Sequence, residues 1–276
     1  MKLALGCALV VALLTTSCMV GDSDDETDDS GLVIEAGARY KSRIFGVKVT
    51  SNVVYTPGLA LDLYEPAGDR AAARPAIVWV HGGAFARNSK TDPNLVRIAR
   101  YFAQLGYVTA SIDYRLLNPN GDAGFPYPAS AVNAARDDAR EAVRFLRRNA
   151  TTYRIDPTRI AIGGASAGAM AALHAAYAGG DRSGAGVRAV VDLWGALQGV
   201  DELGADDNGP VLIFHGTADD FWMPFRQASA LCDRARAVGV GCEFHPLDGE
   251  GHAPWDGLDR YLPVIARFLL AHLVAA

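Results

Sequence analysis

The sequence predicts an α/β fold in which a mostly parallel central sheet of about eight strands is covered by helices on both faces. Short apolar runs alternate along the chain with longer stretches of helical periodicity, and this alternation is typical of strands joined by crossover helices. Such strands are buried on both faces of their sheet. About 245 of the 276 residues follow the N-terminal segment, which suits one domain with one continuous core.

Eight apolar runs are predicted to be strands. They are VKVTSNVVY (47–55), LALDLYEP (59–66), AIVWVHGG (76–83), YVTASIDYR (107–115), IAIGG (160–164), AVVDLWG (189–195), VLIFHG (211–216) and CEFHPL (242–247). In open parallel sheets, ligands gather at the carboxyl ends of the strands. Residues of a functional site are therefore expected directly after these runs.

Four stretches are predicted to be helices. They are Pro93 to Leu105, Ser130 to Asn149, Ala167 to Tyr177 and Phe225 to Val238. In the second stretch the apolar residues fall on one stripe and the arginines fall off it, as in an amphipathic helix. Its charges are interpreted as a solvated face and not as a binding patch.

The N-terminus has the layout of an export signal. Residues 1–18 show one lysine, a short apolar run and then small residues, as in secretory signals. The spacing up to Cys18 resembles a bacterial lipoprotein signal, in which the cysteine is lipidated; ordinary cleavage near Cys18 is the alternative. Residues 19–31 are acidic and are expected to be a disordered tether, and residues 32–276 to form the folded domain. The predicted location is periplasmic, membrane-anchored through lipidated Cys18, or extracellular.

Charge and cysteine content restrict the partners. The net charge is −5 and the basic residues are scattered, which argues against nucleic acid because a basic stripe would be expected for it. Cys232 and Cys242 lie at the end of a predicted helix and the start of the next strand. An exported protein can form disulfides, so a Cys232–Cys242 disulfide is favoured over two buried thiols. No third ligand lies nearby, so no metal site is expected.

Ser166 is the first candidate for a catalytic residue. It lies in GGASAG (163–168), a few residues beyond the run IAI and directly before a predicted helix. Gly164 and Gly168 complete the pattern G-x-S-x-G, in which a serine sits on a sharp strand-to-helix turn that only small neighbours permit. Because this pattern also arises by chance in a chain rich in glycine and alanine, its position after a strand is what favours a nucleophile.

Partners for such a serine follow two later strands. HGTADD comes after VLIF and DGEGH comes after CEFHPL, and we predict Asp219 as the acid and His252 as the base. The imidazole would take the serine proton and the carboxylate would orient the imidazole. Asp220 is the rival acid, and His245, inside a strand run, is the rival base. His215 is expected to brace the turn before the acid.

The stretch VWVHGGAF supplies candidate donors for an oxyanion. Two glycines and an alanine follow a strand, so their backbone N–H groups can turn toward a ligand without hindrance from a Cβ atom. We predict an oxyanion hole made by the N–H groups of Gly83, Ala84 and Ala167, and assign His81 to shaping the loop. Standing alone, the HGGA stretch would be interpreted as an ordinary glycine turn.

Five motifs in this order resemble the α/β-hydrolase carboxylesterases, with greatest similarity to the hormone-sensitive-lipase-like and feruloyl or acetyl-xylan esterase branches. The motifs are HGGA (81–84), SIDYRL (111–116), GASAG (164–168), HGTAD (215–219) and GEGH (249–252). The chain departs from the family at Ala84, where a third glycine is common, and at Ala165, where many relatives carry Asp or Glu. Neither change removes an N–H donor, so both bear on subfamily more than on catalysis.

The resemblance implies a serine esterase that acts through an acyl-enzyme and needs no metal or organic cofactor, and the signal-like N-terminus predicts that it is exported. Only 15 residues separate AVVDLWG from VLIFHG, so little or no cap is expected over the site. An open mouth suits short acyl esters, or acetyl and feruloyl groups on a carrier. Phe85, Trp222 and Trp255 are predicted to line the substrate pocket. Two alternatives are a prolyl-oligopeptidase-like serine peptidase or amidase, and a non-catalytic surface binding module.

Overall fold

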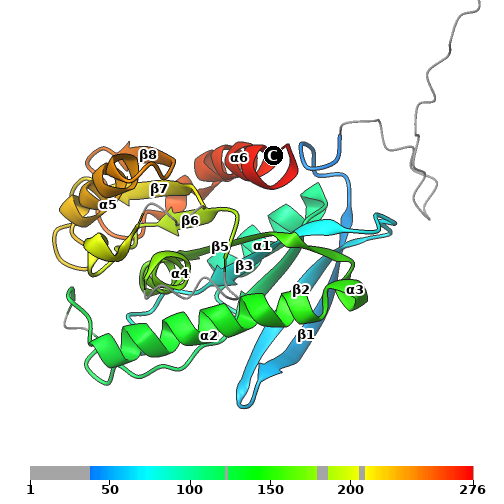
Figure 1. Cartoon of the computed structure of the whole chain (residues 1–276), viewed down its shortest axis with the longest axis horizontal. Coiled ribbons are helices and arrows are strands. Elements are labelled where there is room, and N and C mark those ends of the chain that lie inside the picture. Colours follow the sequence, from blue (N-terminus) through cyan, green and yellow to red (C-terminus); the bar gives the residue numbers. More distant parts are fainter. Residues whose placement is uncertain (1–37, 122–123, 179–185, 205–208, 276) are drawn as a thin grey trace, which may run out of the picture.

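The centre of the molecule is an eight-stranded sheet with the strand order β1-β2-β4-β3-β5-β6-β7-β8 (Figure 1). The computed structural model describes residues 38–121, 124–178, 186–204 and 209–275. β1 and β4 pair antiparallel with β2, and all other neighbouring strands are parallel. The predicted fold class is therefore confirmed. The signal sequence, the acidic tether and Cys18 lie outside the described residues.

The elements follow one another in the predicted alternation. The strands are β1 (Gly46–Thr56), β2 (Leu59–Ala67), β3 (Arg74–Val80), β4 (Val108–Ile112), β5 (Ile155–Ala165), β6 (Val190–Leu193), β7 (Val211–Gly216) and β8 (Cys242–Leu247). The helices are α1 (Pro93–Leu105), α2 (Ala129–Arg148), α3 (Ala150–Tyr153), α4 (Ala167–Tyr177), α5 (Phe225–Ala237) and α6 (Leu258–Leu269). Two 3₁₀ turns, η1 (Val200–Glu202) and η2 (Trp255–Gly257), and a π-helical turn, η3 (Leu270–Val274), complete the described elements.

The sheet separates two halves of the core. In β3 every residue is buried, and successive side chains point to opposite faces. Val78 and Val80 belong to the apolar cluster that includes residues of α2, α4 and α5, while Ile77 and Trp79 belong to the cluster with residues of α1 and α6. Figure 1 shows α2 and α4 on one side of the sheet and α6 on the other. The continuous apolar character of these strands thus results from burial on both faces.

Helix α1 has clear signals at both ends. The Asp92 side chain accepts hydrogen bonds from the backbone N–H groups of Asn94 and Leu95, and Pro93 occupies the first turn. Gly106 ends the helix in the left-handed conformation with φ of 110°, which glycine adopts at little cost. Such caps explain why the predicted bounds of α1 match the observed ones.

Helix α6 is not among the four helices that the sequence patterns predict. Pro263 lies inside it, and an interior proline usually interrupts a helix because it lacks an N–H group. The apolar residues nevertheless keep helical spacing and are buried: Leu258, Tyr261, Leu262, Ile265, Phe268 and Leu269. Burial of this face against the sheet outweighs the missing backbone hydrogen bond.

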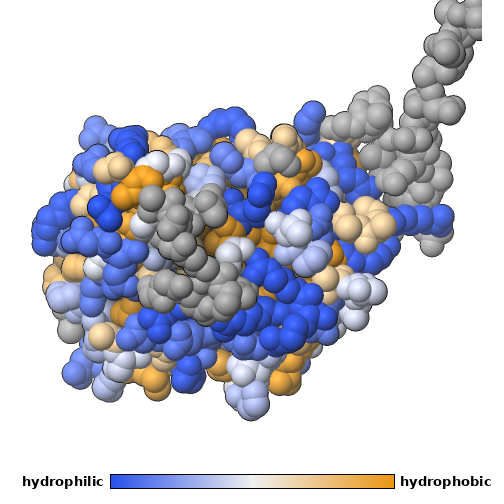
Figure 2. All heavy atoms as spheres, viewed as in Figure 1, coloured by the Kyte–Doolittle hydropathy of each residue, from blue (hydrophilic) through white to orange (hydrophobic). Residues whose placement is uncertain are grey.

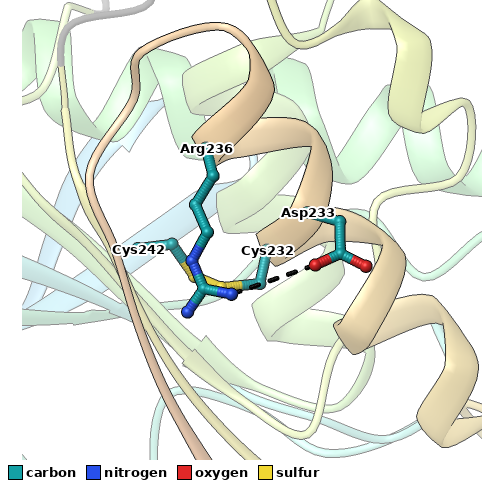
Figure 3. Close-up of a disulfide and its surroundings, with 4 residues drawn as sticks. All are labelled: Cys232, Asp233, Arg236 and Cys242. Carbon is teal, nitrogen blue, oxygen red and sulfur yellow. Dashed lines mark ion pairs between the residues drawn. A yellow bond between two sulfur atoms is a disulfide. The ribbon is translucent and has the colours of Figure 1, made fainter.

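A disulfide joins Cys232 in α5 to Cys242, the first residue of β8, as the sequence favoured (Figure 3). The Cα atoms are 5.6 Å apart, an ordinary separation for this bond. Asp233 and Arg236 form an ion pair beside it. Cys242 is the first residue of β8. The disulfide therefore stabilises the α5–β8 connection at the amino ends of the parallel strands, away from their carboxyl ends.

The surface mixes polar and apolar side chains. Figure 2 shows one face, on which hydrophilic residues surround smaller hydrophobic areas. Val54, Leu116, Leu117 and Phe221 are the large apolar side chains that stand exposed among the described residues. Within the same residues, none of the helices combines the length and the apolar character that crossing a membrane requires.

Candidate active site

Ser166 occupies the sharp turn between β5 and α4. β5 ends at Ala165 and α4 begins at Ala167, so one residue makes the whole turn. Its backbone has φ of 56° and ψ of −123°, a strained conformation for a residue with a side chain. The Ser166 N–H donates to the Leu193 carbonyl of β6 at 2.9 Å, which ties the strained residue to the sheet.

Two glycines make this turn sterically accessible. A Cβ atom on Gly168 would lie 2.1 Å from the Val80 carbonyl oxygen, and one on Gly164 would lie 2.5 Å from the Gly168 backbone. Both distances are far inside van der Waals contact. The helix can therefore approach β3 and β5 closely only because both positions lack a side chain, which is the physical reason for the G-x-S-x-G spacing.

A chain of hydrogen bonds connects the three residues predicted as the triad. The Ser166 hydroxyl lies 2.8 Å from His252 Nε2, and His252 Nδ1 lies 2.6 Å from Asp219 Oδ2. Because the carboxylate only accepts, Nδ1 carries the proton and Nε2 is left to accept the serine proton. Asp219 follows β7 and His252 follows β8, so the three residues meet at the carboxyl ends of three parallel strands.

The environment of Asp219 keeps its carboxyl group ionised. The side chain is buried, with 3% exposure, and burial by itself raises the pKa of a carboxyl. Hydrogen bonds from His215 and His252, the charge of His252 and the N–H of Met223 outweigh burial and hold the pKa of Asp219 well below its ordinary value. An anion at this position stabilises an imidazolium at His252.

His215 contacts the same carboxylate from the other side. Its Nε2 donates to the Met223 carbonyl at 2.6 Å and lies 3.4 Å from Asp219 Oδ2. The ring is fully buried in β7. It therefore holds the loop from Asp219 to Met223 in place, which agrees with the bracing role expected for it.

A second buried carboxyl group, that of Asp192, lies on the neighbouring strand β6. Its Oδ1 accepts from the Gly195 N–H at 2.6 Å, while Oδ2 has no partner among the described residues. Burial raises the pKa of Asp192 to about 6, against the opposing effects of the charge of His215 and of this hydrogen bond. The charged form of Asp192 therefore weakens the folded state, because the unfolded chain would hydrate it.

Replacing this group should change how stability depends on pH. The folded pKa of Asp192 lies above that of an unfolded aspartate, so the folded protein binds the proton more tightly. The stabilisation is present below about pH 4 and is lost as the pH rises through about 6. Relative to Asp192→Asn, the wild type should lose up to about 3 kcal/mol of unfolding free energy between pH 4 and pH 7. Urea unfolding at several pH values measures this difference.

The matched control for that experiment is Asp201→Asn, which removes an exposed carboxylate. It should keep the pH dependence of the wild type. If Asp192→Asn also runs parallel to the wild type from pH 4 to pH 7, the Asp192 carboxyl does not carry a raised pKa.

The predicted oxyanion donors lie in the loop after β3, which carries Gly83 and Ala84, and at the start of α4, which carries Ala167. Gly83 and Ala84 both have positive φ, 116° and 55°, and both line the cavity that contains Ser166. In the described part of the chain, no backbone carbonyl accepts from either group. The Ala167 N–H is in the first turn of α4, where no intrahelical acceptor exists. Unlike Gly83 and Ala84, Ala167 is fully buried and is not among the residues that line the cavity.

Hydrogen bonds and ring stacking from buried side chains hold the loop that carries Gly83 and Ala84. His81 Nδ1 donates to the Gly82 carbonyl at 2.7 Å, and its ring stacks on Tyr114. The Tyr114 hydroxyl donates to the His81 carbonyl, and the Asn118 amide donates to the Ala84 carbonyl at 2.7 Å. Burial lowers the pKa of His81, so its ring is neutral and acts by shaping the loop.

A cavity of about 220 Å³ opens at Ser166. Trp222 and Trp255 line it as predicted. The prediction for Phe85 is wrong: its side chain is fully buried and packs against Tyr114 and Tyr127. Phe85 has a positive φ of 59°, like the residue before it, and this double reversal of the backbone directs the ring into the core.

The structure also shows residues that the sequence patterns did not single out. Trp194 lines the cavity and packs edge-to-face against Trp255, with ring centroids 4.7 Å apart. Its position directly after β6 is the signal that could have identified it. Gly82, Arg87, Asn88 and Asp92 complete the lining on the side of the loop after β3.

The two rivals for the triad lie elsewhere. Asp220 is exposed, and His245 pairs with Glu243 at 2.7 Å on β8 while stacking on Phe214. In the described parts of the chain, no three His, Cys, Asp or Glu residues form a group that could hold a metal ion.

Comparison with protein families gives one match. A family model described as BD-FAE matches residues 61–201, just over half of the chain. The matched region includes Ser166 and the loop after β3, and it ends before Asp219 and His252.

Two curated proteins are similar over part of the sequence. The probable isoprenylcysteine alpha-carbonyl methylesterase ICMEL1 of Oryza sativa subsp. japonica is 34% identical over 127 residues, covering 45% of this chain and 27% of that protein. Phenmedipham hydrolase of Pseudarthrobacter oxydans is 37% identical over 112 residues, covering 40% and 21%. The chain therefore spans only about a quarter of the length of these relatives.

Solved structures show the same fold over most of the chain. Thermogutta terrifontis esterase 2 phosphorylated by paraoxon superposes with a TM-score of 0.66 at 23% identity, covering 82% of this chain and 94% of the esterase. MGS-M1, an alpha/beta hydrolase from a Medee basin deep-sea metagenome library, gives 0.66 at 21% identity, covering 83% and 99%. At these identities the likeness establishes a shared fold.

Proposed function

This chain belongs to the BD-FAE family of α/β hydrolases, and from that premise we propose that it is a serine esterase that hydrolyses carboxylic esters. The observation that carries the proposal is the hydrogen-bonded chain from Ser166 through His252 to Asp219, in which Ser166 and His252 line a cavity. The backbone N–H groups of Gly83 and Ala84, which line the same cavity, are the candidate oxyanion donors. Nucleophile, base, orienting acid and oxyanion donors are the complete set that acyl transfer needs.

In the proposed reaction, Ser166 Oγ attacks the ester carbonyl carbon and its proton passes to His252 Nε2. The carbonyl oxygen becomes an oxyanion that accepts hydrogen bonds from the N–H groups of Gly83, Ala84 and Ala167. When the tetrahedral intermediate collapses, His252 gives its proton to the departing alcohol and an acyl-enzyme remains. Water, deprotonated by His252, then attacks the acyl-enzyme and releases the acid.

The shape of the cavity supports small acyl groups. It measures about 220 Å³ and Trp194, Trp222 and Trp255 form its apolar walls. Among the described residues, one 3₁₀ turn, η1, lies between β6 and β7. We infer that acetyl, other short acyl or feruloyl groups enter the cavity while the alcohol part, small or polymeric, stays outside.

We further propose that the protein is exported. Support comes from the signal-like composition of residues 1–18 and from the acidic segment 19–31 that follows. Lipidation at Cys18 would anchor the domain to a membrane through that segment. Mass spectrometry of the mature N-terminus distinguishes a lipidated Cys18 from a plain cleavage product.

A substrate panel tests the activity. Purified protein should hydrolyse p-nitrophenyl acetate and butyrate faster than longer p-nitrophenyl esters, because the cavity walls limit the acyl chain. Methyl ferulate tests the feruloyl acyl group, acetylated xylan tests acetyl groups on a polymer, and an aminoacyl anilide tests amidase activity. Greater activity on the anilide would favour the peptidase alternative. No hydrolysis together with no labelling by a fluorophosphonate would favour a binding module.

A further inference from the structure

A second concavity, of about 410 Å³, lies between α1 and α6. Its lining residues are Arg43, Pro93, Val96, Arg97, Arg100, Tyr101, Gln104, Asp259, Leu262 and Pro263. Three of these are arginines, in a chain whose net charge is −5. We call this concavity the arginine groove.

The arginine groove and the cavity that contains Ser166 are separate concavities whose lining residues include neighbours in the sequence. At the start of α1, Asp92 lines the cavity and the next residue, Pro93, lines the groove. Near the start of α6, Trp255 lines the cavity and Asp259, four residues later, lines the groove. From Pro93 to Gln104 the groove follows α1 for about 16 Å. A long substrate that places its ester at Ser166 has this groove as a path for the rest of its chain.

Two of the arginines are held in position without a carboxylate partner. The Arg100 guanidinium lies 5.9 Å from the centroid of the Tyr64 ring. The Arg43 guanidinium lies 5.3 Å from that of Tyr101, and its Nε donates to Gln104 Oε1 at 2.7 Å. Within the described ranges, no Asp or Glu forms an ion pair with Arg43 or Arg100. Their remaining N–H groups can bind an anion at little cost in side-chain entropy.

The third arginine spans the groove. Arg97 forms an ion pair with Asp259 of α6, and the two side chains are 50% and 78% exposed. An exposed pair of this kind contributes little to stability, because water solvates both charges nearly as well. A ligand carboxylate can therefore replace Asp259 as the partner of Arg97. Arg97 and Arg100 are one turn apart, about 4.5 Å along the axis, so the groove presents cations in a row.

We propose that the arginine groove binds the carboxylate groups of an acylated, uronate-bearing polysaccharide whose ester is cleaved at Ser166. The guanidinium fork matches the two oxygens of a carboxylate, and a row of cations matches a chain that carries carboxylates at intervals. The walls are polar or charged apart from Val96, Leu262 and the prolines, which suits a sugar chain better than a lipid. This inference rests on the proposed esterase function and adds the class of carrier to it.

The test compares acidic and neutral carriers. Wild type, the triple variant Arg43→Gln, Arg97→Gln, Arg100→Gln, and a control triple Arg148→Gln, Arg188→Gln, Arg236→Gln are assayed on acetylated polygalacturonate, acetylated xylan without uronate, and p-nitrophenyl acetate. The control removes the same charge from exposed arginines elsewhere. In the groove variant, KM for the acidic polymer should rise about tenfold while kcat stays the same. The kcat and KM values for acetylated xylan and p-nitrophenyl acetate should not change. Salt should produce a similar rise in KM for the acidic polymer in the wild type.

Direct binding separates this inference from the proposed function. Deacetylated oligogalacturonate should bind wild type and Ser166→Ala protein in a calorimeter, and binding should weaken about tenfold in the groove variant only. If p-nitrophenyl acetate is cleaved but the groove variant matches the wild type on the acidic polymer, the groove proposal fails and the esterase proposal stands. Equal binding of dextran sulfate would overturn the assignment to carboxylates. If no ester is cleaved but oligogalacturonate binds as described, the groove stands and the esterase proposal fails.

Discussion

Ser166→Ala is expected to abolish ester hydrolysis and labelling by a fluorophosphonate. Without Oγ no acyl-enzyme can form, and the loss of a serine nucleophile in a comparable triad lowers kcat by about 10⁶-fold. The change removes one atom that contacts His252 and leaves the backbone turn to the same small neighbours. The variant should therefore fold, which circular dichroism and the urea midpoint will show.

The matched control is Ser130→Ala, an exposed serine at the start of α2, which should keep full activity. A Ser166→Ala protein that still reacts with the fluorophosphonate would show that another residue is the nucleophile. A Ser166→Ala protein that is unlabelled but still hydrolyses p-nitrophenyl acetate would show that the reaction does not pass through this serine.

The fold and the triad geometry could be predicted because their causes are local in the sequence. Burial on both faces makes strands such as β3 apolar throughout, and the sharp turn requires glycine at two fixed distances around Ser166. Asp219 and His252 each follow a strand, and parallel strands bring their carboxyl ends together. The order of strands and helices along the chain is therefore enough to predict that Ser166, Asp219 and His252, although far apart in the sequence, lie at the same end of the sheet.

Features that depend on side-chain direction could not be predicted in the same way. Phe85 follows the oxyanion loop in sequence but points into the core, because two successive residues have positive φ. The sequence predicts that His215 braces the turn before Asp219, but its 3.4 Å approach to the Asp219 carboxylate depends on which face of β7 the ring occupies. The arginine groove joins Arg43, which precedes β1, to α1 and α6, and no local pattern connects these segments.

Asp219→Asn is expected to lower kcat by about 10⁴-fold with little change in KM. An asparagine has nearly the same shape, but it is neutral and its amide can donate to His252 Nδ1, which selects the tautomer that cannot accept the serine proton. The effect belongs to the transition state, in which His252 becomes positively charged. Steady-state kinetics with p-nitrophenyl acetate measure the two constants separately, and labelling by the fluorophosphonate should slow in parallel.

The neighbouring Asp220 provides the control for this prediction, since Asp220→Asn removes an exposed carboxylate one residue away and should leave kcat nearly unchanged. The reverse result, a mild effect at Asp219 and a large one at Asp220, would identify Asp220 as the acid of the triad.

The lowered pKa of Asp219 adds a prediction on how stability depends on pH. Its stabilisation of the folded state is present above about pH 4, the value for an unfolded aspartate, and is lost as the pH falls toward the lower folded pKa. In Asp219→Asn, the free energy of unfolding should therefore fall less steeply below pH 4 than in the wild type. In Asp220→Asn it should fall as it does in the wild type.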